Sequence, residues 1–203
     1  MRKINLTLLT ILSFFILTSC GDKTPSTPTP TPTPTVQTAG VLTVSSLSSS
    51  TDKQNPIDGA NTLFGSDNYT AIWIEDNKGK FVKTLYVTTA GAKKPSRRTW
   101  LTEWTLKSAS NTVDAKTGAT ALAYGPIIGI WDGKDVNGTL VADGTYTVRM
   151  ELADDGDAIH NGGTGVSSKF SATFTKGTTV VSITGPNFTS FSNNIILWTP
   201  AVL

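Results

Sequence analysis

The chain has 203 residues, 38% of them hydrophobic, and a formal net charge of +2. Its 17 Lys and Arg residues nearly balance its 15 Asp and Glu residues, which excludes the basic surface that nucleic-acid binding depends on. A single cysteine and a single histidine exclude an internal disulfide bond and a transition-metal site built from several such ligands.

The N-terminus has the pattern of a secretory signal peptide. A basic start precedes an apolar run at residues 6–17, which is shorter than the roughly 20 residues that a membrane-spanning helix needs. The run ends in L-T-S-C-G, which resembles the lipobox of bacterial lipoproteins, whose cysteine is acylated and becomes the mature N-terminus. We therefore predict a lipoprotein signal peptide at residues 1–19 and a lipid anchor on Cys20. The alternative is an ordinary signal peptide in which the cysteine has no role.

A proline-rich segment follows the predicted anchor. Residues 24–35 alternate proline with threonine and serine. Because proline fixes φ and removes a backbone donor, this segment is predicted to be an extended spacer of on the order of 37 Å, or else a tail of no consequence. Residues 20–38 are thus the predicted linker, and residues 39–203 are the predicted domain. The predicted location is the bacterial cell envelope, on the periplasmic or outer-membrane face, with the lipid membrane as a partner.

Eight segments of the domain have the alternating or β-branched pattern of strands. They are residues 41–47, 69–75, 81–87, 127–131, 146–152, 168–175, 178–183 and 194–198. Many short strands with little helix predict an all-β fold, an immunoglobulin-like antiparallel β-sandwich with one short helix.

The second and third strands are predicted to form a hairpin, because D-N-K-G at residues 76–79 is typical of a turn. Alternation along the first of them predicts two faces. Tyr69, Ala71 and Trp73 share one face, and Ile72 and Ile74 share the other.

Residues 96–108 form the predicted helix, because Trp100 and Trp104 are four residues apart with Leu101 beside them. With both indoles buried, the helix would cover an open end of the sandwich. With both exposed, they would form an aromatic platform for a carbohydrate or another surface. Four basic residues between positions 93 and 98 are typical of a solvated loop, but beside a pocket they would suit a phosphate.

Residues 131–148 contain W-D-G-K-D-V-N-G followed by V-A-D-G-T-Y-T-V. This pattern resembles the immunoglobulin-like repeat of flagellar hook-capping and cell-surface proteins. Trp131 ends a core strand, and the Asp-Gly and Asn-Gly pairs supply residues with positive φ for the turns. Tyr146 packs its ring while its hydroxyl reaches the backbone. The pattern predicts a fold and carries no chemistry.

A longer series of motifs covers nearly the whole domain. It comprises Y-T-A-I-W-I-E-D at 69–76, G-K-F-V-K-T-L at 79–85, the tryptophan-containing helix, D-A-K-T-G-A-T at 114–120, W-D-G-K-D at 131–135, G-T-Y at 144–146, a strand ending in Glu151, and His160. The series resembles a family of predicted periplasmic bacterial proteins of unknown function, which implies a β-sandwich exported to the envelope. Such proteins are often encoded near FMN transferases and membrane redox proteins, so the resemblance implies an envelope redox protein as partner. Residues 161–203 match only loosely.

The D-A-K-T-G-A-T segment also resembles the flavinylation motif D-x-x-[ST]-G-A-[ST] of FMN-binding subunits in sodium-pumping redox complexes. The resemblance implies FMN bound covalently to Thr120 through a phosphoester, with Asp114, Thr117 and Gly118 completing the cofactor-binding site. Glycine would let the transferase and the phosphate approach, and successive backbone N–H groups can cradle an anion. The aspartate would bind the metal that the transferase uses.

The same seven residues are also typical of a structural turn in which Asp114 caps backbone donors. The FMN-binding subunits usually carry another hydroxyl two residues after the acceptor, where this chain has Leu122, and they have a different fold. Both interpretations stay open at the level of sequence.

The remaining candidates for chemistry are weak. D-D-G-D at residues 154–157 is typical of a solvated loop or of a calcium site, but it lacks the spacing of an EF-hand. His160 is not accompanied by the G-x-S-x-G motif of serine hydrolases. We therefore predict no catalytic residue and no metal site. The predicted role is non-enzymatic binding or structure, in association with an extracytoplasmic redox system. The alternatives are a flavinylated electron carrier and a carbohydrate- or surface-binding module.

Overall fold

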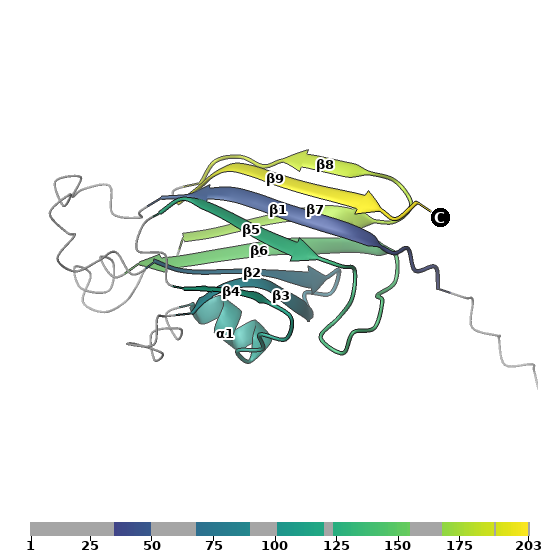
Figure 1. The fold of residues 1–203 in the computed structure, drawn as a ribbon, viewed down its shortest axis with the longest axis horizontal. Coiled ribbons are helices and arrows are strands. Elements are labelled where there is room, and N and C mark those ends of the chain that lie inside the picture. Colours follow the sequence, from purple (N-terminus) through teal and green to yellow (C-terminus); the bar gives the residue numbers. More distant parts are fainter. Residues whose placement is uncertain are drawn as a thin grey trace, which may run out of the picture. The chain divides into compact units, whose positions relative to one another are not determined.

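The computed structural model describes residues 35–49, 68–89, 101–119, 124–154, 168–188 and 190–202. Residues 35–203 form one compact unit (Figure 1). The predicted signal peptide, the predicted anchor Cys20 and the linker up to residue 34 lie outside the described residues. None of the helices described is long and apolar enough to cross a membrane.

Nine strands in the described part of the chain build two sheets. The four-stranded sheet has the order β5 (Pro126–Trp131), β1 (Gly40–Ser48), β9 (Phe191–Pro200) and β8 (Val181–Thr184). The five-stranded sheet has the order β4 (Lys116–Ala119), β3 (Phe81–Thr89), β2 (Asn68–Asp76), β6 (Gly144–Asp154) and β7 (Ser168–Lys176). Neighbours run antiparallel except for β3 and β4, which are parallel. The two sheets confirm the predicted all-β, immunoglobulin-like sandwich.

The main core lies between the two sheets and is built from their inward-facing aliphatic and aromatic side chains. Trp131 is central to it, with its ring centroid 5.4 Å from that of Tyr146 and 6.1 Å from that of Phe174. Trp198 of β9 lies 6.2 Å from the same ring. Aromatic rings at these separations contribute both buried area and favourable edge contacts, so this cluster ties β5 to both sheets.

A second, smaller core lies on the other face of the five-stranded sheet. The predicted division of β2 into two faces is confirmed, because Ile72 and Ile74 belong to the main core and Tyr69, Ala71 and Trp73 belong to the smaller one. The helix α1 (Thr102–Ser108) covers this apolar face, as Figure 1 shows beside β3 and β4.

The helix differs from its prediction in length and in place. It begins at Thr102, because Leu101 has a non-helical backbone (φ −77°, ψ 72°), and residues 96–100 lie outside the described part. It covers a sheet face and not an open end of the sandwich. The physical reason is that the outward positions of β2 and β3 carry apolar side chains, which a solvated sheet face would leave in contact with water.

All eight predicted strands are present, with changed boundaries and one addition. The strand predicted at residues 194–198 is β9, which runs from 191 to 200, and the one predicted at 146–152 is β6, which is two residues longer at each end. The strand predicted at residues 178–183 begins only at Val181, because residues 177–179 form the bend that follows β7. The additional strand, β4, has four residues, one of them Gly118, and this is too short a pattern for alternation to be detected.

Candidate functional site

Three of the sequence motifs meet at the side chain of Lys83, which lies in G-K-F-V-K-T-L on β3. Asp114 begins D-A-K-T-G-A-T, and Asp132 belongs to W-D-G-K-D. Lys83 Nζ lies 3.3 Å from Asp114 Oδ2 and 3.6 Å from Asp132 Oδ1. We call Lys83, Asp114 and Asp132 the motif junction. It joins segments from both sheets and from the loop that follows α1.

The three groups of the motif junction differ strongly in exposure. The Lys83 side chain is 6% exposed, whereas those of Asp114 and Asp132 are 70% and 50% exposed. A buried ammonium group needs an ionic partner, because removing it from water without one is costly. Two carboxylates bind that ammonium from the solvent side. Asp132 is shared with a second cation, because Lys134 Nζ lies 3.7 Å from its Oδ2, so Asp114 is the carboxylate most open to a partner.

Asp114 is held by the loop between α1 and β4. Its backbone has a φ of 56°, a left-handed conformation that aspartate tolerates better than most residues. Thr84 of β3 fixes the loop by donating its hydroxyl to the Asn111 carbonyl oxygen over 2.6 Å, and Ala115 N donates to the Thr112 carbonyl oxygen. Because Thr84 follows Lys83 on β3, the loop that carries Asp114 is attached to the same strand that carries Lys83.

Asp132 is held by the turn that follows β5. Its Oδ1 accepts a hydrogen bond from Lys134 N, and the Lys134 carbonyl oxygen accepts one from Trp131 Nε1 over 2.6 Å. Gly133 provides the positive φ (77°) that the turn requires. The predicted packing of Tyr146 is also observed, with its hydroxyl donating to the Ala142 carbonyl oxygen over 2.7 Å.

Asp135 stabilises the next turn and adds negative charge near Lys83. Its carboxylate accepts hydrogen bonds from the backbone N–H groups of Asn137 and Thr139. Burial acts to raise the pKa of Asp135, but these hydrogen bonds and the charge of Lys83 outweigh it and hold the pKa below its ordinary value. Asp135 therefore stays ionised well into acid.

The D-A-K-T-G-A-T segment is a turn only at its beginning. From Lys116 to Ala119 it forms β4, an edge strand that pairs with residues 86–89 of β3. The turn interpretation is thus wrong for these four residues. The free edge of β3 provides hydrogen-bond partners for their backbone groups, which in a turn would bind water instead. Just before this segment, Asn111 Oδ1 accepts a hydrogen bond from Val113 N.

The predicted cofactor-binding residues are therefore only partly brought together. Asp114 is drawn to Lys83, and the backbones of Thr117 and Gly118 lie in β4. Thr120, the predicted FMN acceptor, lies outside the described residues. Lys83 and Asp132 are not identified as site residues from the sequence. The only indication in the sequence is that each of them lies within one of the motifs.

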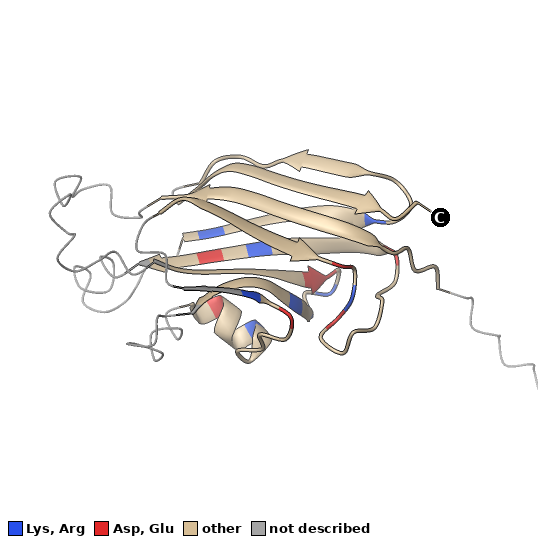
Figure 2. Ribbon diagram, viewed as in Figure 1, with Lys and Arg blue, Asp and Glu red and all other residues tan. Residues whose placement is uncertain are grey.

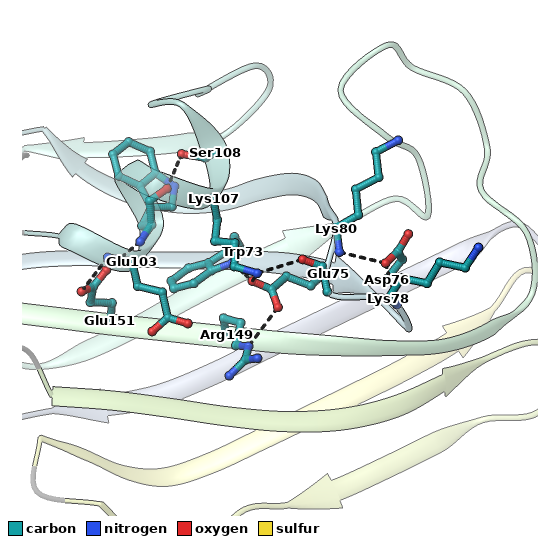
Figure 3. Close-up of polar contacts among 12 residues, drawn as sticks. Trp73, Glu75, Asp76, Lys78, Lys80, Glu103, Lys107, Ser108, Arg149 and Glu151 are labelled. Atoms are coloured by element: carbon teal, nitrogen blue, oxygen red, sulfur yellow. Dashed lines mark hydrogen bonds and ion pairs between the residues drawn. The ribbon is translucent and has the colours of Figure 1, made fainter.

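Glu151 holds the start of α1 onto the sheet (Figure 3). This carboxylate on β6 is fully buried and accepts hydrogen bonds from Trp104 N (2.8 Å), Glu103 N (3.2 Å) and the Thr102 hydroxyl (3.3 Å). The helix has no side-chain cap of its own. Because the first N–H groups of a helix have no partner within it, a buried anion there satisfies several donors at once.

Glu75 forms a second buried ionic group near the other end of α1. Figure 3 shows its carboxylate between Trp73 and Arg149, with Trp73 Nε1 donating over 3.0 Å and Arg149 Nε over 3.1 Å. Lys107 Nζ of the helix lies 3.7 Å away. Two cations and an indole compensate one buried carboxylate, so these groups are structural contacts between helix and sheet.

The aromatic-platform hypothesis is contradicted at Trp104. Its indole is fully buried in the smaller core, and its Nε1 donates to the Thr84 hydroxyl over 3.0 Å. Trp100 lies outside the described residues. Because Trp104 is buried, the two tryptophans do not form the exposed pair that a platform needs. The four-residue spacing of the two tryptophans was compatible with core packing and with a ligand platform. For Trp104, the burial shows core packing.

The other candidates lie largely outside the described residues. These are the basic residues at 93–98, the acidic residues at 155 and 157, and His160. In the part of the chain that the structure describes, no three His, Cys, Asp or Glu side chains are grouped to hold a metal ion.

Comparison with known proteins identifies a family for this chain. Residues 55–160, just over half of the chain, match the model of a family described as "Predicted periplasmic protein (DUF2271)". No curated protein and no solved structure gave a significant match. The matched span includes Lys83, Asp114 and Asp132, and ends at residue 160, before the region that matched the motif series only loosely. The chain therefore belongs to the DUF2271 family of predicted periplasmic proteins.

Proposed function

We propose that this is a non-enzymatic, lipid-anchored protein of the cell envelope that docks onto an envelope redox protein through the motif junction. The family is described as periplasmic, and Cys20 with its proline-rich linker would tether the domain to the membrane. One observation supports the docking role above all. Three motifs that are far apart in the chain converge on one ion cluster whose two carboxylates lie open to solvent.

The chemistry of the junction suits a partner with basic side chains. Asp114, Asp132 and the nearby Asp135 face two cations, Lys83 and Lys134, which leaves one negative charge in excess. Opposite charge on a partner speeds association and selects the orientation. Arginine is the best match, because its planar guanidinium can bind carboxylate oxygens in pairs. The neighbouring edge strand β4 pairs with β3 alone among the described strands, and such an edge can accept a further strand.

Site-directed photo-crosslinking in the envelope tests this proposal. A photoreactive residue at Lys116 of β4 is expected to capture a redox protein, and the double change Asp114→Asn with Asp132→Asn is expected to abolish the capture. Glu103→Gln on α1 serves as the control, because it removes a partly exposed carboxylate charge and leaves the junction intact. Capture of the same protein by the double variant at the level of the control would contradict the docking role.

A flavinylated electron carrier is the second candidate, with FMN on Thr120. Two observations favour it: Asp114 is exposed, and the edge strand β4 ends at Ala119, the residue before the predicted acceptor in the chain. Co-expression with the host's FMN transferase, followed by intact mass measurement, tests it. A gain of one FMN that Thr120→Ala removes and Thr139→Ala retains would establish the carrier. An unmodified mass, with the transferase active on a control substrate, would exclude it.

A further inference from the structure

The four-stranded sheet contains no charged residue in any of its strands. The sequences of β1, β5, β8 and β9 lack Asp, Glu, Lys and Arg, whereas each strand of the other sheet, and α1, contains at least one. Figure 2 shows the contrast, with the four strands tan along their length. A neutral face offers no ionic partner, so any charged group docked on it would lose water without compensation.

In two rows at the middle of this sheet the outward side chains alternate in size from strand to strand, whereas near the ends of β1 the outward Val41 and Leu47 are large and exposed. Two rows follow from the pairing registers. One row is Ile130, Thr43, Leu197 and Ser182, and the other is Ile128, Ser45, Ile195 and Thr184. In these rows the large side chains of β5 and β9 are exposed, and Ile130 is 60% exposed. The small side chains of β1 lie between them and are only partly exposed to solvent. Both rows therefore read large, small, large, small across the sheet.

This alternation makes the face complementary to itself. A two-fold axis that lies in the interface, parallel to the strands and midway between β1 and β9, places β9 of one copy over β1 of the other. It also places β5 over β8, so that a large side chain meets a small one at all four positions of each row. Strand directions are kept by this rotation, which suits the aligned packing of two twisted sheets about 10 Å apart.

We propose that two copies of this protein associate face to face through their four-stranded sheets about this axis. The size of the face supports a dimer of modest affinity. Four strands spaced ~4.8 Å apart, with ~3.3 Å per residue, give a flat footprint on the order of 450 Å². Protruding side chains make the contact area larger than this footprint. Stable interfaces bury ~800 Å² per partner, so this one falls at or below the lower end of that range.

A lipid surface suits this face less well than a second copy does. Proteins that rest on membranes use Lys, Arg, Trp and Tyr at the interface. The four strands carry no basic residue, and both of their tryptophans, Trp131 and Trp198, are buried in the main core. Asp132 of the motif junction follows β5 directly, but the dimer is tested at residues outside the junction, so the inference stands or falls independently of the docking role.

Sedimentation equilibrium of the mature chain from residue 20, with Cys20→Ser to prevent lipidation, tests the dimer up to ~500 µM, where weak association is still measurable. Thr43→Leu is expected to weaken it by opposing two leucines, and Leu197→Thr by leaving a gap. Each change occurs twice in a two-fold interface, so the loss should reach on the order of 100-fold. The double variant restores one large and one small side chain at that contact and should recover to within about tenfold of the wild type.

Ile130→Lys is expected to abolish the dimer, because it would bury two unpaired charges, whereas Thr173→Lys on the outward face of β7 should leave it unchanged. Circular dichroism checks that each variant is folded. A wild-type chain that remains monomeric throughout would overturn the proposal. A dimer that the single changes weaken and the double change does not recover would overturn the proposed axis.

Discussion

Glu151 occupies the place that a capping side chain normally takes at the start of a helix, although it belongs to a strand. It lies 47 residues from Trp104, whose N–H it accepts. The carboxylate is fully buried, and its charge is compensated by donors at the start of α1. A hydrogen bond to a charged group contributes more than one between neutral groups, so this residue should be a main contact between helix and sheet.

Replacing Glu151 by glutamine should lower the free energy of unfolding by about 1–3 kcal/mol, because the helix N-terminus loses its anion while the volume is kept. Urea denaturation with a fixed slope measures the change. Glu103→Gln is the control, since its ion pair with Lys169 at the surface should contribute no more than about 1 kcal/mol. Equal losses in both variants would contradict the capping role of Glu151.

Asp143 connects the end of the linker to the sandwich. Its carboxylate accepts hydrogen bonds from the backbone and hydroxyl of Thr38 and from the buried Lys176. Burial acts to raise the pKa of Asp143, but the hydrogen bonds and the charge of Lys176 prevail and hold the pKa below its ordinary value. The folded state therefore binds this proton less readily than the unfolded state does.

The depressed pKa of Asp143 predicts a loss of stability in acid. Its contribution is fully present above the unfolded pKa of about 3.9 and disappears as the pH falls through the lower folded pKa. Asp143→Asn should therefore destabilise the protein at neutral pH and approach the wild type as the pH falls through the folded pKa of Asp143. Thermal unfolding across this pH range measures the difference. Thr38→Val should reduce the acid sensitivity as well, and curves that stay parallel in acid would contradict the assignment.

At the scale of elements, α1 depends on the sheet for its stability. Seven residues are too few for an isolated helix in water. Trp104 inserts between α1 and the outer face of the five-stranded sheet, where Trp73 and Val87 are part of the same cluster. On the opposite side of the helix, Leu106 is 82% exposed. Trp104 therefore anchors the helix to the sheet, and the exposed Leu106 is a position on the same helix with which it can be compared.

Trp104→Ala should cost about 3–5 kcal/mol, because it removes a buried indole and the hydrogen bond to Thr84. Leu106→Ala on the same helix should change stability by no more than about 0.5 kcal/mol. Denaturant unfolding compares the two. A loss in Leu106→Ala as large as that in Trp104→Ala would show that the exposed face of α1 is also packed.

At the scale of the whole molecule, the two sheets come into close contact where β5 faces β3. Gly129 allows this, since a Cβ atom there would lie 3.1 Å from the Cβ of Leu85 and 3.4 Å from Ile72 side-chain atoms. Larger residues on β5 would separate the sheets or force the core to rearrange.

Gly129→Val should therefore destabilise the protein by about 1–3 kcal/mol through overpacking. Gly125→Val, just before the same strand, provides the matched control, because an added Cβ atom there meets nothing within 4 Å. Thermal unfolding measures both. If Gly125→Val proved as harmful as Gly129→Val, the cost would arise from valine itself and not from the contact between the sheets.

The fold class and all the strands but β4 could be predicted from the sequence, because alternation of apolar and polar residues follows directly from the two faces of a strand. Ile72 and Ile74 were predicted to share one face and Trp73 the other, and the structure agrees. The turn residues of W-D-G-K-D-V-N-G were equally predictable, because positive φ favours glycine at Gly133 and Gly138. These features are local, so short stretches of sequence contain all the information that they need.

Only the tertiary structure decided which charged residues belong together. Glu151 alternates with apolar neighbours on β6, a pattern typical of a solvent-facing position, yet α1 buries it. Lys83 meets Asp114 and Asp132 through two long-range connections that no spacing in the chain reveals. The strand β4 likewise forms because β3 has a free edge, and not because its own four residues favour it. Ion pairs, helix caps and edge strands depend on partners distant in sequence, and the folded chain alone supplies those partners.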